Sequence, residues 1–181
     1  MASGFPSRPP RRIFLIGPMG VGKTTLGQQL AQALGYRFLD SDKEIERRTG
    51  ATIPLIFELE GEAGFRQREA AMIDELSQLD QVVLATGGGA VLRPENRRHL
   101  AGRGHVVYLR ADIDKLLERT ARDRNRPLLQ TDNPRQKLLD ILETREPLYR
   151  EIADQVVETG SHTVRETLKL LTRNLQRHDP A

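Results

Sequence analysis

The stretch GPMGVGKTT, residues 17–25, follows the short apolar run RRIFLIG and opens a segment with helical periodicity. It fits the pattern G-x-x-x-x-G-K-[ST] at every fixed position, and its place between a strand and a helix separates it from an accidental glycine turn. In this pattern backbone N–H groups curl round phosphate oxygens, the lysine reaches the β- and γ-phosphates and the hydroxyl ligates Mg²⁺. The sequence therefore predicts a nucleoside triphosphate site formed by Gly17, Gly20, Val21, Gly22, Lys23, Thr24 and Thr25.

Apolar runs and helical patterns alternate along the rest of the chain. Further strands are expected at YRFLD, QVVLAT, HVVYL and DQVVET, and helices at residues 23–34, 42–48, 53–59, 62–79, 94–100, 112–120, 135–146 and 163–177. Strands without polar alternation, separated by helices, indicate a parallel sheet covered on both faces. We expect a three-layer α/β/α fold with a five-stranded parallel sheet. Residues 1–10 are expected to form a flexible tail and residues 11–178 one P-loop domain, because no linker or repeat marks a second one.

Composition limits the classes of function. The 28 basic and 25 acidic residues leave a net charge of only +3, which does not indicate a nucleic-acid partner. The chain has no cysteine, so disulfides and thiolate metal sites are excluded. No apolar leader core and no apolar run of membrane-spanning length is present. We expect a cytoplasmic protein without membrane contact, and a monomer, since no feature indicates an interface.

Two large classes of P-loop protein are disfavoured by missing motifs. Neither D-x-x-G nor N-K-x-D, which switch GTPases require, occurs in the sequence. The strand at QVVLAT ends in threonine and glycines, whereas motor and AAA-type ATPases carry an acidic residue there. A kinase of a small molecule fits the remaining pattern better.

The predicted magnesium site needs an acidic partner. Asp40 ends the second expected strand, at the sheet edge where ligands gather in such folds, and Asp42 lies two residues further on. The alternative role for either aspartate is helix capping, which Asp42 would fill for a helix beginning at Lys43. For Asp42 the two roles stay open on these grounds.

A second glycine-rich loop, TGGGAV, follows the strand expected to lie beside the P-loop strand. Gly87, Gly88 and Gly89 have no Lys-Ser/Thr pair after them, so they make a poor second phosphate cradle. Their amides suit close approach by a small, oxygen-rich ligand, whereas a tight turn with positive φ explains three glycines less well. We therefore expect this loop to bind the phosphoryl acceptor.

Two arginines extend the expected acceptor site. Arg66 follows the core residue Phe65 and has Glu69 three residues later to hold it, and Arg145 stands at an expected helix end just before Pro147. Either arginine alone is more typical of a solvated surface. Together with Asp42 and the glycines they indicate an acceptor with one anionic group and several hydroxyls.

The ordered motifs GPMGVGKTT, FLDSD, GFRQRE, TGGGAV, RPLL and TREPLY resemble those of the shikimate kinase family across roughly residues 11–175. The resemblance implies a fold like that of nucleoside monophosphate kinases, with a mobile lid at about residues 119–134 and an acceptor-binding segment at about residues 41–70. It implies ATP and Mg²⁺ as co-substrate and cofactor, and transfer of a phosphoryl group to shikimate on the route to chorismate and aromatic amino acids.

The same resemblance implies roles for individual residues. Asp42 would bind the acceptor hydroxyls beside the attacking one, while Arg66 and Arg145 would pair with the carboxylate of shikimate. The acceptor-binding set would be Asp42, Phe57, Phe65, Arg66, Gly87, Gly88, Gly89 and Arg145. Arg126 would reach the phosphates on lid closure, and Arg119 would lie against the adenine. Lys23, Asp42 and Arg126 would act in catalysis, and Thr24 and Asp40 would hold the metal.

Some features stay outside the resemblance. Arg122 and Arg124 match no family position, and the adenine loop near residues 160–163 does not align clearly. A second enzyme class, a small-polyol kinase such as gluconate kinase, shares the P-loop and an early acidic pair. A regulatory nucleotide-binding module without catalysis is the third alternative, which the intact Lys23, Thr24 and Asp40 disfavour.

Overall fold

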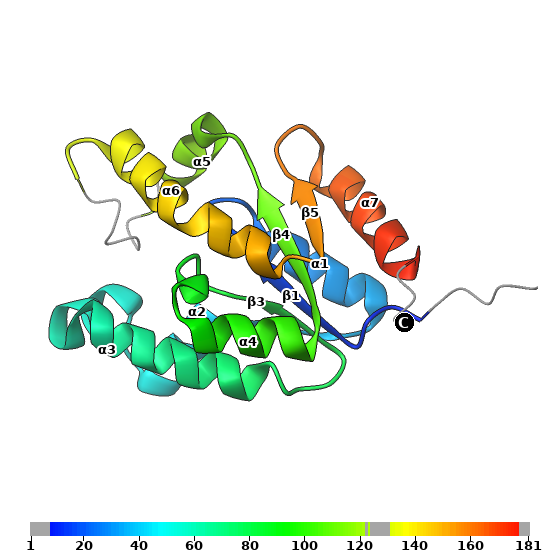
Figure 1. Ribbon diagram of the computed structural model, residues 1–181, viewed down its shortest axis with the longest axis horizontal. Helices are drawn as coiled ribbons and strands as arrows, with labels where there is room; N and C mark the ends of the chain where they lie inside the picture. The colour runs from blue at the N-terminus through cyan, green and yellow to red at the C-terminus, as the bar shows by residue number, and fades with distance from the viewer. Residues whose placement is uncertain (1–7, 122, 124–130, 178–181) are drawn as a thin grey trace, which may run out of the picture.

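Five parallel strands form one sheet in the order β2-β3-β1-β4-β5, as the sequence predicts (Figure 1). The strands are β1 (Arg12–Ile16), β2 (Arg37–Asp40), β3 (Val82–Ala85), β4 (His105–Arg110) and β5 (Gln155–Glu158). The computed structural model describes residues 8–121, 123 and 131–177. Strand β1 lies at the centre, paired with β3 on one side and β4 on the other. The P-loop and the TGGGAV loop therefore leave the sheet from neighbouring strands at the same edge.

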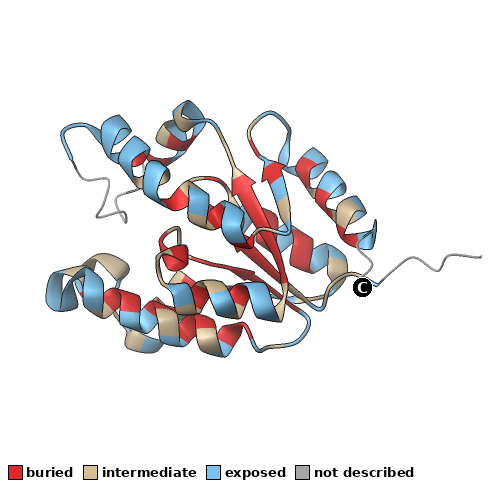
Figure 2. Ribbon diagram, viewed as in Figure 1, coloured by how far each residue is buried: buried red, intermediate tan, exposed pale blue. Residues whose placement is uncertain are grey.

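Helices cover both faces of the sheet. They are α1 (Lys23–Leu34), α2 (Ser41–Thr49), α3 (Ile53–Leu76), α4 (Pro94–Arg103), α5 (Ile113–Thr120), α6 (Pro134–Ile152) and α7 (Val164–Arg177), with the short 3₁₀ helix η1 (Ala90–Leu92) before α4. Side chains alternate across a strand, so Ile13 and Leu15 pack under α1, α5 and α7 while Phe14 and Ile16 pack under α3, α4 and the end of α6. The central strands are buried except at Arg12, which begins β1, and Arg110, which ends β4 (Figure 2).

Helix α3 contains the two helical segments expected at 53–59 and 62–79, joined across a break. Gly61 at the break has φ 71° and ψ 178°, a conformation that only glycine adopts readily. The helix ends at Leu76 rather than at residue 79, although Leu79 still packs against the core. The break at Gly61 kinks the helix, so its two segments run in different directions.

Helix α6 continues past Pro147, so the expected helix end at residue 146 was wrong. A proline inside a helix removes one backbone hydrogen bond and normally kinks or ends the helix. Here Tyr149 is fully buried and Ile152 nearly so, both in the core on the α3 and α4 face. Burial of these side chains outweighs the lost bond and continues the helix.

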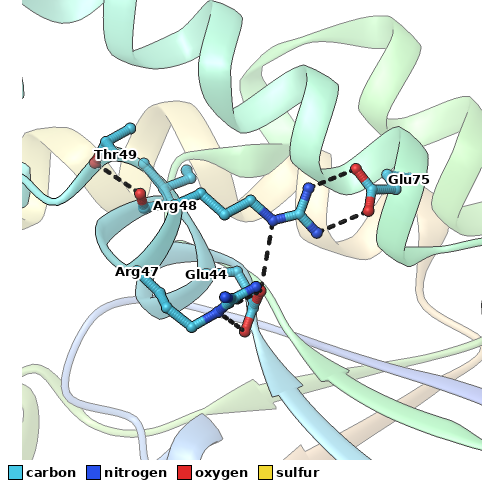
Figure 3. A network of polar contacts seen from close by, with 6 residues as sticks. Glu44, Arg47, Arg48, Thr49 and Glu75 are labelled. Atoms are coloured by element: carbon cyan, nitrogen blue, oxygen red, sulfur yellow. Dashed lines mark hydrogen bonds and ion pairs between the residues drawn. The ribbon is translucent and has the colours of Figure 1, made fainter.

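Helix α2 is held to α3 by charged side chains (Figure 3). The guanidinium of Arg48 donates two hydrogen bonds of 2.7 Å to the carboxylate of Glu75, and its Nε lies 3.7 Å from Glu44. Arg47 also pairs with Glu44, at 2.9 Å. These contacts orient the helix that follows Asp40 against the helix that carries Arg66.

Candidate active site

The P-loop combines close packing with an open phosphate side. Its three glycines have positive φ angles: 145° at Gly17, 79° at Gly20 and 101° at Gly22. A Cβ at Gly17 would lie 2.3 Å from the carbonyl oxygen of Leu109, and one at Gly20 would lie 2.8 Å from Thr120. The Nζ of Lys23 donates to the carbonyl oxygens of Gly17 and Pro18 at 2.7 and 2.8 Å. All three glycines are thus favoured by their positive φ angles, and Gly17 and Gly20 are also required by the close approach of β4 and α5, whereas a Cβ at Gly22 would have nothing within 4 Å.

A cavity of about 420 Å³ lies over this loop. It is lined on the P-loop side by Gly20, Val21, Gly22, Lys23, Thr24, Thr25 and Leu26, and on other sides by Asp40, Asp42, Thr86, Gly87, Gly88, Arg119, Thr159, Gly160, His162, Val164 and Thr167. The predicted P-loop residues other than Gly17 therefore share one cavity with both aspartates and two glycines of the second loop. Gly17 lies beneath, against β4.

Asp40 joins the P-loop to α2. Its Oδ2 accepts a hydrogen bond of 2.8 Å from Thr24 Oγ1, and its Oδ1 accepts from the amides of Asp42 and Lys43. Asp40 is therefore the N-cap of α2, which begins at Ser41. The alternative of Asp42 as the cap was wrong, and its side chain lines the cavity instead.

The TGGGAV loop is not a positive-φ turn. None of Gly87, Gly88 and Gly89 has a positive φ angle, and Gly89 has φ −94°. The alternative of a tight turn that needs positive φ was therefore wrong. Close approach explains the glycines instead. A Cβ at Gly87 would lie 2.7 and 2.8 Å from oxygens of Glu69 and Asp42, and one at Gly89 would lie 2.3–2.6 Å from the guanidinium of Arg66. The loop lies directly against the charged side chains of the expected acceptor site.

Arg66 and Arg145 are buried, with only 8% and 5% exposed surface. The alternative of two solvated surface arginines was therefore wrong. Arg66 Nη1 donates to Glu69 Oε1 at 2.8 Å, and Glu69 has no exposed surface. Burial raises the pKa of Glu69, which Arg66 and Arg145 oppose, and burial lowers the pKa of Arg145. Arg66 also pairs with the half-exposed Glu62 at 3.4 Å. Two buried cations thus face one buried carboxyl group, and this surplus of buried positive charge suits another anion.

Phe57 and Phe65 lie beside this cluster on the two segments of α3. Their ring centroids are 5.0 Å apart, and the guanidinium of Arg66 lies 5.2 Å from the Phe65 ring. Phe65 is buried in the core, whereas Phe57 is partly buried against it. The two rings form an apolar support for Arg66.

Of the remaining predicted arginines, the structure describes Arg119 but not Arg126. Arg119 Nη1 donates to the carbonyl oxygens of Gly20 and Val21, both at 3.2 Å, and it lines the cavity beside Gly160. Arg126 lies outside the described residues, as do Arg122 and Arg124. The loop near residues 160–163, which the sequence left open, contributes Gly160 and His162 to the cavity.

Besides cavity-lining residues such as Thr86 and Thr159, sequence analysis missed Ser41 and Tyr149, which hold the TGGGAV loop. Ser41 is fully buried, and its Oγ accepts from the amide of Gly87 at 3.2 Å. Tyr149 is also fully buried, and its hydroxyl donates to the carbonyl oxygen of Gly88 at 2.5 Å. Both belong to quoted motifs, FLDSD and TREPLY, but neither has a sequence signal of its own because their contacts join distant segments.

Within the described ranges, no helix combines the length and apolar character of a membrane span. The same ranges hold no group of three or more His, Cys, Asp or Glu side chains placed to bind a metal.

Comparisons with known proteins agree with this geometry. The family model described as shikimate kinase matches residues 19–176. The shikimate kinase of Methylococcus capsulatus is 62% identical over 159 residues, covering 88% of this chain and 89% of that protein. The solved structure titled shikimate kinase from Acinetobacter baumannii in complex with shikimate is 53% identical, with a TM-score of 0.89, covering 91% of this chain and 92% of that one. A gluconokinase from Sinorhizobium meliloti, 21% identical with a TM-score of 0.54 over 96% of this chain and 99% of that one, shares the fold alone.

Proposed function

The chain belongs to the shikimate kinase family, and we propose that its site transfers the γ-phosphoryl group of ATP to the 3-hydroxyl of shikimate, giving ADP and shikimate 3-phosphate. It is a phosphotransferase with an alcohol group as acceptor, in the pathway to chorismate and aromatic amino acids. The single observation that carries the assignment of the site is the buried Arg66–Glu69–Arg145 cluster under the TGGGAV loop, next to the P-loop cavity.

The cluster suits the carboxylate of shikimate. The Gly88 position lies near both the P-loop and Arg145, because an added Cβ there would be 3.4 Å from the Met19 amide and 3.5 Å from Arg145 Nη1. An acceptor held by the two arginines would therefore reach the cavity where the triphosphate binds. Arg66 and Arg145 would bind its carboxylate, and the amides of Gly88 and Gly89 would donate to it.

Asp42 lies between the proposed nucleotide site and the proposed acceptor site. It lines the nucleotide cavity, and its Oδ1 lies 2.8 Å from where a Gly87 Cβ would be. We assign it to bind the acceptor hydroxyls and orient the attacking one. Phosphoryl transfer passes through a loose transition state, so positioning and charge neutralisation contribute more than a strong base. Lys23 and Arg126 would supply positive charge to the phosphates.

The residues present fit Mg²⁺. One hydroxyl and one carboxylate, 2.8 Å apart at the mouth of the P-loop, are hard oxygen donors. Magnesium is commonly held by one or two such groups together with waters and substrate phosphates. Thr24 would bind the ion and Asp40 would support its water shell. When bound, it neutralises charge on the β- and γ-phosphates.

The test is an ADP-release assay with ATP, Mg²⁺ and one acceptor at a time. Shikimate should give ADP at a rate far above that with gluconate or without acceptor. Equal rates with gluconate would favour the small-polyol kinase, and no acceptor-dependent ADP would favour a regulatory nucleotide-binding module. The monomeric state and the cytoplasmic location stay predictions.

A further inference from the structure

We propose that the hydroxyl of Tyr149 is a positioning group that sets the Gly89 amide and the Arg145 guanidinium for the acceptor, an inference that rests on the proposed function. Tyr149 lies one helical turn after Arg145 on α6 and is fully buried. Its hydroxyl is 2.5 Å from the carbonyl oxygen of Gly88. One polar atom thus connects α6 to the loop expected to bind the acceptor.

The peptide between Gly88 and Gly89 is a rigid plane. The carbonyl of Gly88 and the N–H of Gly89 belong to one peptide group, which is trans because the described chain has no cis peptide. In a trans peptide the C=O and N–H point in opposite directions within one plane. Fixing the Gly88 oxygen therefore fixes the direction of the Gly89 N–H. Glycines restrict their own backbone least, so this loop depends on such anchors.

The loop has a second anchor at its start. The amide of Gly87 donates to Ser41 Oγ, and Thr86 donates to the carbonyl oxygen of Leu15 through both its amide and its hydroxyl. These bonds hold the residues before the Gly88–Gly89 peptide. Tyr149 is the side chain that holds the peptide itself.

Arg145 precedes Tyr149 by one helical turn on α6. A tyrosine hydroxyl has one proton to donate, and that proton points at Gly88, so its lone pairs are left for a neighbouring cation. Burial lowers the pKa of Arg145, and the nearby Tyr149 hydroxyl opposes this effect. Arg145 Nη1 lies 3.5 Å from where a Gly88 Cβ would be, so the residue whose carbonyl accepts from Tyr149 also adjoins the guanidinium that we assign to the acceptor.

The ring of Tyr149 supplies a matched control. It stacks on Tyr108 of β4, with ring centroids 5.0 Å apart and an interplanar angle of 26°. Tyr108 is 2% exposed, so both tyrosines are core residues. Phenylalanine preserves the ring and its stacking at either position. Tyr149→Phe and Tyr108→Phe therefore remove the same atom from the two halves of one aromatic pair.

The experiment measures kcat and KM for both substrates in wild type and the two variants. Tyr149→Phe should raise the KM for shikimate on the order of tenfold, as expected for loss of one buried hydrogen bond, with the KM for ATP nearly unchanged. The Tyr149→Phe variant should also discriminate less between shikimate and its carboxamide, because the Arg145 guanidinium would no longer be held in position. Tyr108→Phe should change neither quantity. Equal effects of the two variants, or an equal rise in both KM values, would overturn the positioning role.

Glycine-selective ¹⁵N labelling of the wild-type protein gives a second measurement that does not depend on a variant that folds. Shikimate should shift the Gly89 amide resonance strongly and that of Gly102, an exposed helical glycine, very little. An unshifted Gly89 amide would overturn the proposal. A wild-type protein without activity on shikimate would overturn the proposed function as well, whereas an active wild type with an unaltered Tyr149→Phe variant would overturn the positioning role alone.

Discussion

The hydroxyl of Thr24 and the carboxylate of Asp40 meet at 2.8 Å, although they belong to different elements. Thr24 is in the first turn of α1, and Asp40 is the last residue of β2 and the N-cap of α2. The two carboxylate oxygens of Asp40 have different partners. Oδ1 accepts from the first amides of α2, and Oδ2 accepts from the Thr24 hydroxyl of the P-loop. One side chain therefore supports both a predicted metal site and the start of the helix that carries Asp42.

The first prediction concerns magnesium. Thr24→Val and Asp40→Ala should each require a much higher Mg²⁺ concentration for half-maximal activity, because each removes one hard oxygen donor from the site. Titration of Mg²⁺ at saturating ATP and shikimate measures this. An unchanged Mg²⁺ dependence in both variants would exclude Thr24 and Asp40 from the metal site.

Asp40→Asn separates the two functions of Asp40. Asparagine caps helices about as well as aspartate, so α2 should keep its start, whereas loss of a cap to alanine costs on the order of 1 kcal/mol. We expect Asp40→Asn to retain most of the thermal stability that Asp40→Ala loses while still weakening Mg²⁺ activation. Weak Mg²⁺ activation in the alanine variant alone would assign its defect to the helix cap.

The second prediction concerns Arg126, which lies outside the described residues and is assigned by the family pattern alone. Arg126→Ala should lower kcat far more than it weakens shikimate binding, by on the order of a hundredfold, because a lost transition-state contact to phosphate is worth a few kcal/mol. Arg122→Ala and Arg124→Ala are the matched controls from the same segment. Similar losses of kcat in all three would instead indicate a diffuse basic surface.

The third prediction is a pH dependence of stability from Glu69. Burial raises the pKa of Glu69 above its ordinary value of 4.5, and Arg66 is the largest effect opposing this rise. Between the unfolded and the higher folded pKa, the native state binds the proton that the unfolded state has lost, so stability falls as pH rises through this window. Arg66→Ala should raise the folded pKa of Glu69 further and lose more stability than wild type as the pH rises above about 4.5. Urea unfolding across this range measures it.

Two variants test the origin of that slope. In the Arg66→Ala background, Glu69→Gln should remove the added pH dependence, because the buried group no longer titrates. Arg68→Ala breaks an exposed pair with Glu60 on the same helix, where pairing lowers the pKa of Glu60. That variant should add no pH dependence above pH 5. A slope in Arg66→Ala that survives Glu69→Gln would contradict the assignment to Glu69.

Local patterns predicted most of the fold. The P-loop match, the apolar strands and the start of α1 at Lys23 all depend on residues close in sequence, and each was confirmed. The end of α6 was not predictable locally, because a proline at 147 normally stops a helix and only tertiary burial of Tyr149 overrides it.

In the proposed acceptor site, too, contacts between residues close in sequence could be predicted, whereas contacts between distant residues could not. Arg66 and Glu69 are three residues apart on one helix, so their pairing could be inferred from spacing. The bonds from Tyr149 to Gly88 and from Gly87 to Ser41 span 61 and 46 residues, and no local pattern signals them. The cap of α2 lies at Asp40 rather than Asp42 because the strand passes into the helix without an intervening turn.

The last prediction tests why the TGGGAV loop carries glycine at 89. A Cβ there would lie 2.3–2.6 Å from the guanidinium of Arg66, so Gly89→Ala should push that side chain away from the proposed carboxylate site. Calorimetric titration should show weaker shikimate binding with ATP binding almost unchanged, and less discrimination between shikimate and its carboxamide, as in Arg66→Ala and Arg145→Ala. Gly102→Ala, on an exposed turn of α4 with nothing within 4 Å, is the control and should leave both affinities as in wild type. The three glycines have no positive φ, so a general loss of fold is not expected from backbone strain. Parallel losses of ATP and shikimate affinity in a folded Gly89→Ala protein would contradict the acceptor role of this loop.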